Sequence, residues 1–266
     1  MKFRYAAIAA LISGLGCASA MAGEAEDKGL RIANEVDKRD VGYVDQEADA
    51  RMVLRNKQGE ESERVMRVRA LEGPQDVSAG DRGLIIFDEP KDVAGTALLT
   101  HSFPKKQDDQ WLYLPALKRV KRIASRNKSG PFMGSEFSYE DLSNQDVEKY
   151  TYRYLRDEAC ANGLTCFVVE RFPRDKYSGY QRQVVWIDSA EYRVMKAEYY
   201  DRRNSLLKTL STEGWNQYEG QFWRPDSMSM VNHQTGKSTL FEWNNFRFKS
   251  GFNERDFDKG ALKRIR

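Results

Sequence analysis

The sequence predicts a mainly β protein whose strands form an antiparallel meander that closes into a barrel or half-barrel. Between residues 49 and 248, apolar and polar residues alternate in short runs, which is typical of strands with one buried face. Turn residues interrupt these runs roughly every 8–15 positions, and most links have hairpin length, so successive strands should pair as antiparallel neighbours. We expect about eleven strands. Residues 23–266 should form a single domain, of a length that all-β domains often reach.

The first 22 residues are expected to be a secretory signal peptide that is cleaved after Ala22. Lys2 and Arg4 precede an apolar stretch, and Ala20–Ala22 supplies the small residues that signal peptidase accepts. An uncleaved membrane anchor is the alternative, but the apolar stretch is short for a bilayer core of about 30 Å. Lipidation at Cys17 is a second alternative, disfavoured because the residue three positions earlier is not leucine-like. The mature protein is therefore expected in the periplasm.

The charge of the chain is nearly balanced. The full sequence has 43 basic and 40 acidic side chains, and loss of Lys2 and Arg4 with the signal peptide leaves 41 against 40. A balance this even gives no reason to expect a nucleic-acid partner, because nucleic-acid-binding surfaces are usually strongly basic.

After the signal peptide, the sequence predicts one helix and then strands. Glu24–Lys38 is amphipathic, with Leu30, Ile32, Ala33 and Val36 near one face. The alternating runs expected to form strands are Asp49–Arg55, Glu63–Leu71, Arg82–Asp88, Gly95–Phe103, Trp111–Leu114, Arg119–Ile123, Lys149–Asp157, Cys166–Phe172, Gln181–Ile187, Tyr192–Tyr199, Leu206–Trp215, Phe222–Val231 and Ser238–Phe248.

Two helical segments are expected to interrupt or follow these strands. Ser138–Asn144 is predicted to be a short helix capped by Ser138 inside the longest loop, Ala124–Asp146. The second is Asn253–Arg266, from which Phe257, Leu262 and Ile265 are expected to dock on the sheet.

Cys160 and Cys166 are expected to form a structural disulfide. They flank Asn162-Gly163, a strong signal for a tight turn, so the two thiols can come within bonding distance. An oxidising periplasm would close the bond. A metal site is the alternative, but two cysteines with no nearby histidine supply only two ligands.

The sequence offers little catalytic chemistry. His101 and His233 are each alone beside an expected strand, and solitary histidines are usually structural. Thr235–Ser238 resembles the end of a phosphate-binding loop, but Val231 stands where its first glycine should be, so we interpret it as a turn. We therefore expect no catalytic residues, no metal and no cofactor.

Large apolar side chains exceed the need of one thin core. The aromatic members are Trp111, Tyr113, Trp186, Trp215, Trp223 and Trp243, and the methionines are Met195, Met228 and Met230. Methionine and aromatic side chains suit an adaptable pocket for a flexible apolar ligand, although ordinary core packing explains any single one of them. A half-barrel must either fill its interior with such side chains or leave a cavity.

Four segments resemble the family of outer-membrane lipoprotein-sorting proteins. They are DQWLYLPALKRVKRI at 109–123, GPFMGSEFSYEDL at 130–142, VWID at 185–188 and KAEYYD at 196–201. The likeness extends over essentially the whole mature chain. It implies the fold of the periplasmic lipoprotein carrier, an incomplete antiparallel barrel with helices as a lid over a hydrophobic cavity.

The resemblance also implies a function: binding and shuttling of a hydrophobic ligand without catalysis. Members of this family often accompany transporters of the resistance-nodulation-division class, so the cargo is a lipid or a lipoprotein. The arginine that fastens the carrier's lid has candidates here only by strand position, Arg67 and Arg69. The residues expected to contact the cargo are Trp111, Tyr113, Phe132, Met133, Phe137, Trp186, Met195, Met228 and Met230.

The loop Ala124–Asp146 is the expected gate. Gly130 and Gly134 permit hinge motion around Pro131–Met133, an apolar triplet expected to be exposed at the cavity mouth. The neighbouring basic run, Lys118, Arg119, Lys121 and Arg122, is expected either to meet anionic head groups and partners or to be a solvated strand face.

These observations favour a periplasmic carrier of an acylated or otherwise apolar cargo. The alternative from another class is a non-catalytic sensor or accessory module that regulates an inner-membrane exporter or an envelope-stress response. An enzyme acting on lipid is the third hypothesis, disfavoured by the missing catalytic residues.

Overall fold

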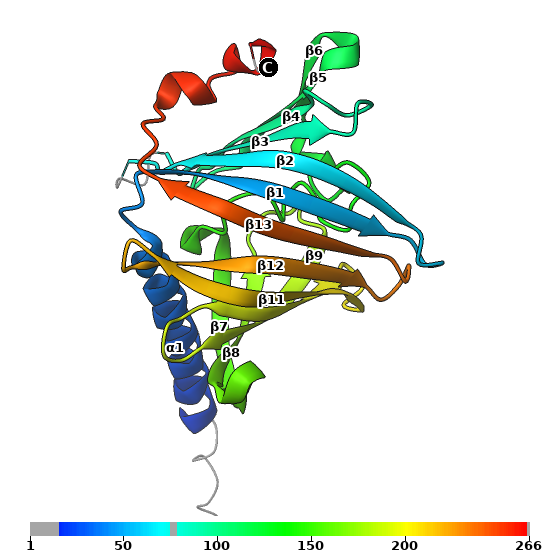
Figure 1. Ribbon diagram of the computed structural model, residues 1–266. Helices are drawn as coiled ribbons and strands as arrows, with labels where there is room; N and C mark the ends of the chain where they lie inside the picture. The colour runs from blue at the N-terminus through cyan, green and yellow to red at the C-terminus, as the bar shows by residue number, and fades with distance from the viewer. Residues whose placement is uncertain (1–15, 75–78, 265–266) are drawn as a thin grey trace, which may run out of the picture.

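The computed structural model describes residues 16–74 and 79–264. Within these residues one α-helix, α1 (Gly16–Asp40), accompanies a single open sheet of thirteen strands (Figure 1). The strands are β1 (Asp45–Arg55), β2 (Glu61–Leu71), β3 (Arg82–Glu89), β4 (Ala97–His101), β5 (Asp109–Leu114), β6 (Arg119–Ile123), β7 (Tyr150–Ala159), β8 (Thr165–Pro173), β9 (Tyr180–Asp188), β10 (Val194–Asp201), β11 (Leu206–Tyr218), β12 (Phe222–Asn232) and β13 (Ser238–Phe248). None of the described helices is long and apolar enough to cross a bilayer.

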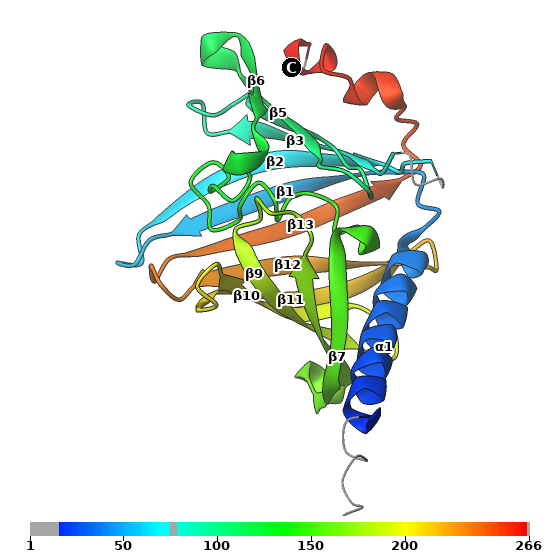
Figure 2. The same ribbon diagram turned by 180° about the vertical axis from the view of Figure 1, so that it is seen from behind.

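The strands pair antiparallel in the order β6-β5-β4-β3-β2-β1-β13-β12-β11-β10-β9-β8-β7. The sheet therefore consists of two meanders, β1–β6 and β7–β13, which join where β1 pairs with β13. Its edges are β6 and β7, which are consecutive in the chain. Residues 124–149, here called the crossover segment, carry the chain from one edge to the other along the concave side of the curved sheet (Figure 2). The expected single meander is thus interrupted once.

The main core lies on the inner face of the sheet, the face that carries α1 and the crossover segment. Ile32 of α1 and Phe132 and Phe137 of the crossover segment belong to the same buried cluster as Met52 of β1 and Met66 of β2. The crossover segment thus fills part of the barrel interior, because burying its aromatic rings removes a large apolar area from water.

Two smaller clusters cover the outer face. One joins Leu84, Ile86 and Leu99 to Phe257 and Leu262 of the C-terminal segment. The other surrounds Cys166. The predicted docking of Phe257 and Leu262 is confirmed, although the C-terminal segment forms two short 3-10 helices, Glu254–Phe257 and Ala261–Lys263. Ile265 lies outside the described residues.

Other sequence expectations are confirmed or corrected by these elements. The predicted helix at Glu24–Lys38 is confirmed as part of α1. The expected signal peptide lies largely outside the described residues, and its cleavage after Ala22 stays a prediction. The expected number of strands, about eleven, was too low, because all thirteen of the runs named above form strands.

The predicted helix at Ser138–Asn144 is wrong, since these residues form turns. The Asp141 carboxylate accepts hydrogen bonds from the Ser138 backbone N–H, at 2.6 Å, and from the Ser138 hydroxyl. It also pairs with Lys208 of β11 at 2.6 Å. These contacts hold residues 138–141 in a turn.

Candidate functional site

α1 crosses the inner side of the sheet from β7 to β12 and is fastened to it in its middle and at its C-terminal end. A Cβ atom at Gly29 would lie 2.8 Å from the Tyr154 backbone nitrogen, so only glycine lets the helix approach β7 this closely. The Lys28 ammonium lies 3.5 Å from the centre of the Tyr154 ring. At the C-terminal end of α1, Arg39 contacts Glu191, and Asp40 pairs with Arg224 of β12 at 2.6 Å.

Beneath α1 lies a cavity of about 520 Å³, here called the apolar chamber. Its floor is built from inward-facing side chains of six consecutive strands of the second meander, β7–β12, and its roof includes Ala33 and Val36 of α1. The floor residues are Tyr152, Val169, Val185, Ile187, Val194, Ala197, Tyr199, Leu210 and Met228. This volume is within the range of small-molecule sites, which are concave and mostly apolar.

The mouth of the apolar chamber is acidic. Carboxylates come from α1, from the link between β2 and β3, and from the crossover segment: Asp37, Asp40, Glu72, Asp81, Asp141, Asp146 and Glu148. Arg171 is the one cationic side chain among the described lining residues. The pKa of Asp37 is raised, first by partial burial and then by repulsion from neighbouring carboxylates, led by those of Asp146 and Glu148.

We expect Asp37→Asn to stabilise the protein at neutral pH. Folding raises the pKa of Asp37, so the ionised side chain lowers the free energy of unfolding at neutral pH. This loss of stability disappears as the pH falls through the raised pKa towards the unfolded value near 3.8. Wild-type Tm should therefore rise on mild acidification more than that of the variant. Thermal unfolding between pH 7 and pH 4 checks this, with Glu26→Gln on the exposed side of α1 as the control. Parallel curves for wild type and Asp37→Asn would contradict it.

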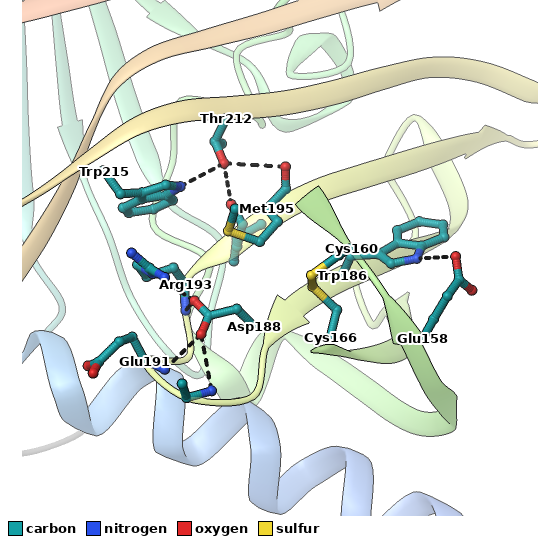
Figure 3. The surroundings of a disulfide bond; sticks show 12 residues. Glu158, Cys160, Cys166, Trp186, Asp188, Glu191, Arg193, Met195, Thr212 and Trp215 are labelled. Carbon is teal, nitrogen blue, oxygen red and sulfur yellow. Dashed lines mark hydrogen bonds and ion pairs between the residues drawn. A yellow bond between two sulfur atoms is a disulfide. The ribbon is translucent and has the colours of Figure 1, made fainter. Parts of the chain in front are cut away.

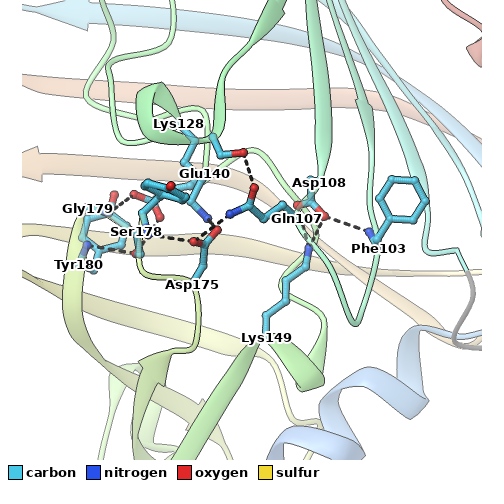
Figure 4. A network of polar contacts seen from close by, with 12 residues as sticks. Phe103, Gln107, Asp108, Lys128, Glu140, Lys149, Asp175, Ser178, Gly179 and Tyr180 are labelled. Atoms are coloured by element: carbon cyan, nitrogen blue, oxygen red, sulfur yellow. Dashed lines mark hydrogen bonds and ion pairs between the residues drawn. The ribbon is translucent and has the colours of Figure 1, made fainter.

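A second cavity of about 660 Å³, here called the polar chamber, opens between the two edges of the sheet. The link between β4 and β5, the crossover segment and the link between β8 and β9 surround it (Figure 4). Pro104, Asn144, Gln145 and Glu148 line both cavities, so the two chambers adjoin at the end of the crossover segment.

Ion pairs hold the wall of the polar chamber together. The Lys149 ammonium lies 2.8 Å from the Asp108 carboxylate and 2.7 Å from that of Asp146. Burial alone would lower the pKa of Lys149, but these two carboxylates outweigh it and hold that pKa above its ordinary value. Lys128 pairs with Asp175 at 2.6 Å, which ties the crossover segment to the link between β8 and β9 (Figure 4).

Glu140 completes the wall of the polar chamber. Its carboxylate accepts hydrogen bonds from the Ser178 hydroxyl and the Gly179 backbone N–H, both at 2.8 Å. Its pKa is raised because the group is largely buried and because Asp141 is next to it, and these two causes outweigh the two hydrogen bonds.

The crossover segment is clamped to the sheet by a buried polar network. Lys208 of β11 and Asp141 are each 4% exposed, and the Lys208 ammonium also donates to the Glu136 carbonyl oxygen at 2.9 Å. The Tyr180 hydroxyl donates to the other oxygen of Asp141 at 2.7 Å. Arg67 and Arg69, the lid candidates, are on the outer face instead, paired with Asp88 and Glu47.

The residues predicted to contact cargo are divided between the two faces of the sheet. Met228 lines the apolar chamber. Phe132, Phe137 and Met230 are buried in the inner core, and Met133 packs against it. Trp111 and Tyr113 belong to the outer cluster under the C-terminal segment, and Trp186 and Met195 to the outer cluster at the disulfide. Cargo contact by these residues stays a prediction.

Most of the predicted cargo residues are aromatic residues or methionines, whereas most residues on the floor of the apolar chamber are aliphatic. In β9, Val185 and Ile187 face inward, and Trp186 between them faces outward. A β-bulge in β10 between Val194 and Lys196 leaves Met195 unpaired on the outer face. Strict alternation of side-chain direction along β9 identifies Val185 and Ile187 as floor residues. The bulge in β10 cannot be recognised from the sequence.

The expected gate is anchored to the inner core. Phe132 has no exposed surface and packs against Phe87, with ring centres 5.6 Å apart, so the prediction of an exposed apolar triplet is wrong. Met133 and Gly134 have positive φ angles of 49° and 83°, and this turn directs Phe132 inward. Gly130, at the start of the segment, is partly buried. Gating by this segment stays a prediction.

The basic run lies on and beside the free edge of the sheet. Lys118, Arg119, Lys121 and Arg122 are exposed around β6, and Arg122 pairs with Asp109. None of the four lines either chamber. Their contact with head groups or a partner stays a prediction.

The predicted disulfide is confirmed. Cys160 and Cys166 are bonded across the turn between β7 and β8, with their Cα atoms 5.8 Å apart (Figure 3). Cys166 and Trp186 belong to the same buried cluster, and the Trp186 indole N–H donates to Glu158 at 3.2 Å. The bond therefore secures the end of the hairpin that β7 and β8 form.

Comparisons with known proteins agree with this architecture. A family model described only as an uncharacterised protein matches residues 79–264. The crystal structure of a LolA superfamily protein from Nitrosomonas europaea is 19% identical with a TM-score of 0.67, and the match covers 88% of this chain and 98% of that one, which shows the fold alone. The comparison with curated proteins gives no match.

Two solved structures are closer in sequence. A DUF1329 family protein from Desulfovibrio piger is 31% identical with a TM-score of 0.84, over 90% of this chain and 99% of that one. An outer membrane lipoprotein-sorting protein domain from Vibrio parahaemolyticus is 54% identical with a TM-score of 0.86, over the same shares of the two chains. The chain therefore belongs to the outer membrane lipoprotein-sorting protein family.

Proposed function

We propose that the protein is a non-catalytic periplasmic carrier that holds the acyl chains, or another apolar part, of a lipid or lipoprotein in the apolar chamber. The observation that carries this proposal is an open cavity with a mostly aliphatic floor inside a curved sheet. Each CH₂ group moved from water into such a cavity gains about 0.8 kcal/mol. The family relationship and the shared LolA superfamily fold support the same role.

The carrier would exchange its cargo with a membrane and with an inner-membrane transporter of the resistance-nodulation-division class. For membrane or transporter contact, the exposed basic run around β6 is the candidate surface. The crossover segment would act as the gate, and its residues 144–148 are the part that borders both chambers. Movement of this part would open the apolar chamber without displacing Phe132 from the core.

Filling the floor of the apolar chamber should abolish cargo binding. Ala197 of β10 is buried and lines the chamber, so a phenyl ring at this position would occupy the space of several methylene groups. We expect Ala197→Phe to be isolated empty, whereas wild type carries a lipid. Native mass spectrometry of detergent-free preparations, followed by identification of the released lipid, measures the difference.

Ala97→Phe is the matched control for this experiment. Ala97 is equally buried but belongs to the outer cluster of β3 and β4, so its replacement costs a similar overpacking energy of about 1–3 kcal/mol without touching the chamber. Lipid should remain bound to this variant. Equal occupancy in both variants, or wild type that is always empty, would overturn the proposed function.

A further inference from the structure

The rim of the polar chamber carries four cationic side chains without an acidic partner. Lys105 and Lys106 come from the link between β4 and β5, and Arg174 and Lys176 from the link between β8 and β9. All four are exposed, and none forms an ion pair with any of the described residues. Lys106 and Lys176 contact only nearby rings, those of Phe103 and Tyr177, and Arg174 donates to the Tyr150 carbonyl oxygen.

The acids of the polar chamber, by contrast, are mostly neutralised from within the wall. Asp108 is paired with Lys149 and Asp175 with Lys128. The Glu140 carboxylate accepts hydrogen bonds from the Ser178 hydroxyl and the Gly179 backbone N–H. Glu148, which also lines this chamber, forms no ion pair among the described residues, but the four unpaired cations outnumber it, so the electrostatic potential at the chamber mouth is positive.

The two adjoining chambers thus differ in both polarity and sign. The apolar chamber has an aliphatic floor and an acidic mouth with Arg171 as its lining cation. Asp40, Asp141 and Asp146 at that mouth are paired with Arg224, Lys208 and Lys149. Asp37, Asp81 and Glu148 form no ion pair among the described residues, so the mouth keeps a negative charge that repels an anionic group. Across the shared wall of residues 144–148, the polar chamber offers cations and room for a head group. The pair of chambers has the charge pattern that an amphiphile with an anionic head requires.

We propose that the polar chamber is the head-group site of the carrier, and that it binds the phosphate or carboxylate of an anionic amphiphile whose apolar part occupies the apolar chamber. This inference rests on the proposed function and names the chemical class of its cargo. Arg174 and the three lysines would contact the anion at the rim. Phosphate and carboxylate are the groups that such charge-assisted hydrogen bonds favour.

The test compares ligands that share one tail and differ in the head. Decyl phosphate, decyl trimethylammonium and decyl maltoside are titrated below their micellar concentrations into delipidated full-length mature protein, and inorganic phosphate is titrated alone. We expect decyl phosphate to bind at least tenfold more tightly than decyl maltoside, with the cationic ligand weakest. This preference should shrink as salt is raised, because screening weakens exposed charge interactions.

Two variants with equal changes in charge test whether the polar chamber causes the preference for decyl phosphate. Replacing Lys105, Lys106, Arg174 and Lys176 by glutamine should remove the tenfold preference and leave decyl maltoside binding unchanged. The control replaces Lys57, Lys91, Arg203 and Lys237, which are also exposed, line neither chamber and form no ion pairs among the described residues, and it should keep the preference. Circular dichroism and Tm confirm that both variants are folded.

Each outcome has one meaning. If decyl maltoside and the charged ligands all fail to bind wild type, the proposed function fails. If they bind without a preference for phosphate, or if the control variant loses the preference equally, only the head-group site is overturned. Inorganic phosphate that binds alone as tightly as decyl phosphate would also overturn it, because the site would then recognise free anions.

Discussion

Replacing Lys208 by methionine is expected to lower the free energy of unfolding by about 3–5 kcal/mol. Lys208 and Asp141 are almost fully buried, so the substitution leaves a carboxylate in the interior with only the Ser138 and Tyr180 donors. It also removes the donor to the Glu136 carbonyl oxygen and thereby frees the crossover segment from β11. Denaturant unfolding at pH 7 gives the difference directly.

Two further variants separate the ion pair from simple loss of packing. Lys237→Met changes an exposed lysine in the turn after β12 and should leave stability nearly unchanged. The double variant Lys208→Met with Asp141→Leu removes both buried charges and should recover much of the loss, because an apolar pair can replace a buried ion pair at little cost. A single variant as stable as Lys237→Met would disprove the clamp.

Asp188→Ala is the second substitution with a large expected effect, also about 3–5 kcal/mol. The Asp188 carboxylate has no exposed surface and accepts hydrogen bonds from the backbone N–H groups of Ala190, Glu191 and Arg193 (Figure 3). It also pairs with the Arg193 guanidinium at 2.7 Å. Alanine would leave these donors and the cation without their acceptor.

The effect of Asp188→Ala should depend on pH. Burial acts to raise the pKa of Asp188, but the backbone hydrogen bonds and Arg193 outweigh it, and that pKa is lowered. The contribution of Asp188 to the free energy of unfolding is therefore fully present above its unfolded pKa near 3.8 and is lost as the pH falls through its folded pKa. The difference in the free energy of unfolding between wild type and Asp188→Ala should therefore become smaller in acid. Asp201→Ala, in the more exposed turn between β10 and β11, should cost much less; equal losses would refute the role of burial.

The local elements of this fold follow from the sequence, because local rules govern them. A short run of strand-forming residues marks each of the thirteen strands, and the Asn162-Gly163 turn places Cys160 opposite Cys166. The strand order does not follow, since β1 finds its second neighbour in β13, almost the whole length of the chain away. No local pattern records a pairing over such a separation, which only the complete set of strands determines.

The candidate site is predicted less well because it depends on which way side chains point. Trp111 and Trp186 are large and apolar, but both face outward, and Trp186 stands between the inward-facing Val185 and Ile187. The polar chamber is assembled from three links that are far apart in the sequence, and its cations resemble ordinary solvated charges when read one at a time. Lys208 gives no signal at all until Asp141 lies beside it.

The pairing of β1 with β13 also determines how the chain can fold. Each meander can form from local hairpins, but the ladder between residues 45–55 and 238–248 must wait for the last strand, and such distant contacts form slowly. In a chain exported with its N-terminus first, β1 would reach the periplasm long before its partner. Until then it exposes an unpaired edge, the feature through which sheets aggregate. The N-terminal meander is therefore the segment that most needs protection during translocation.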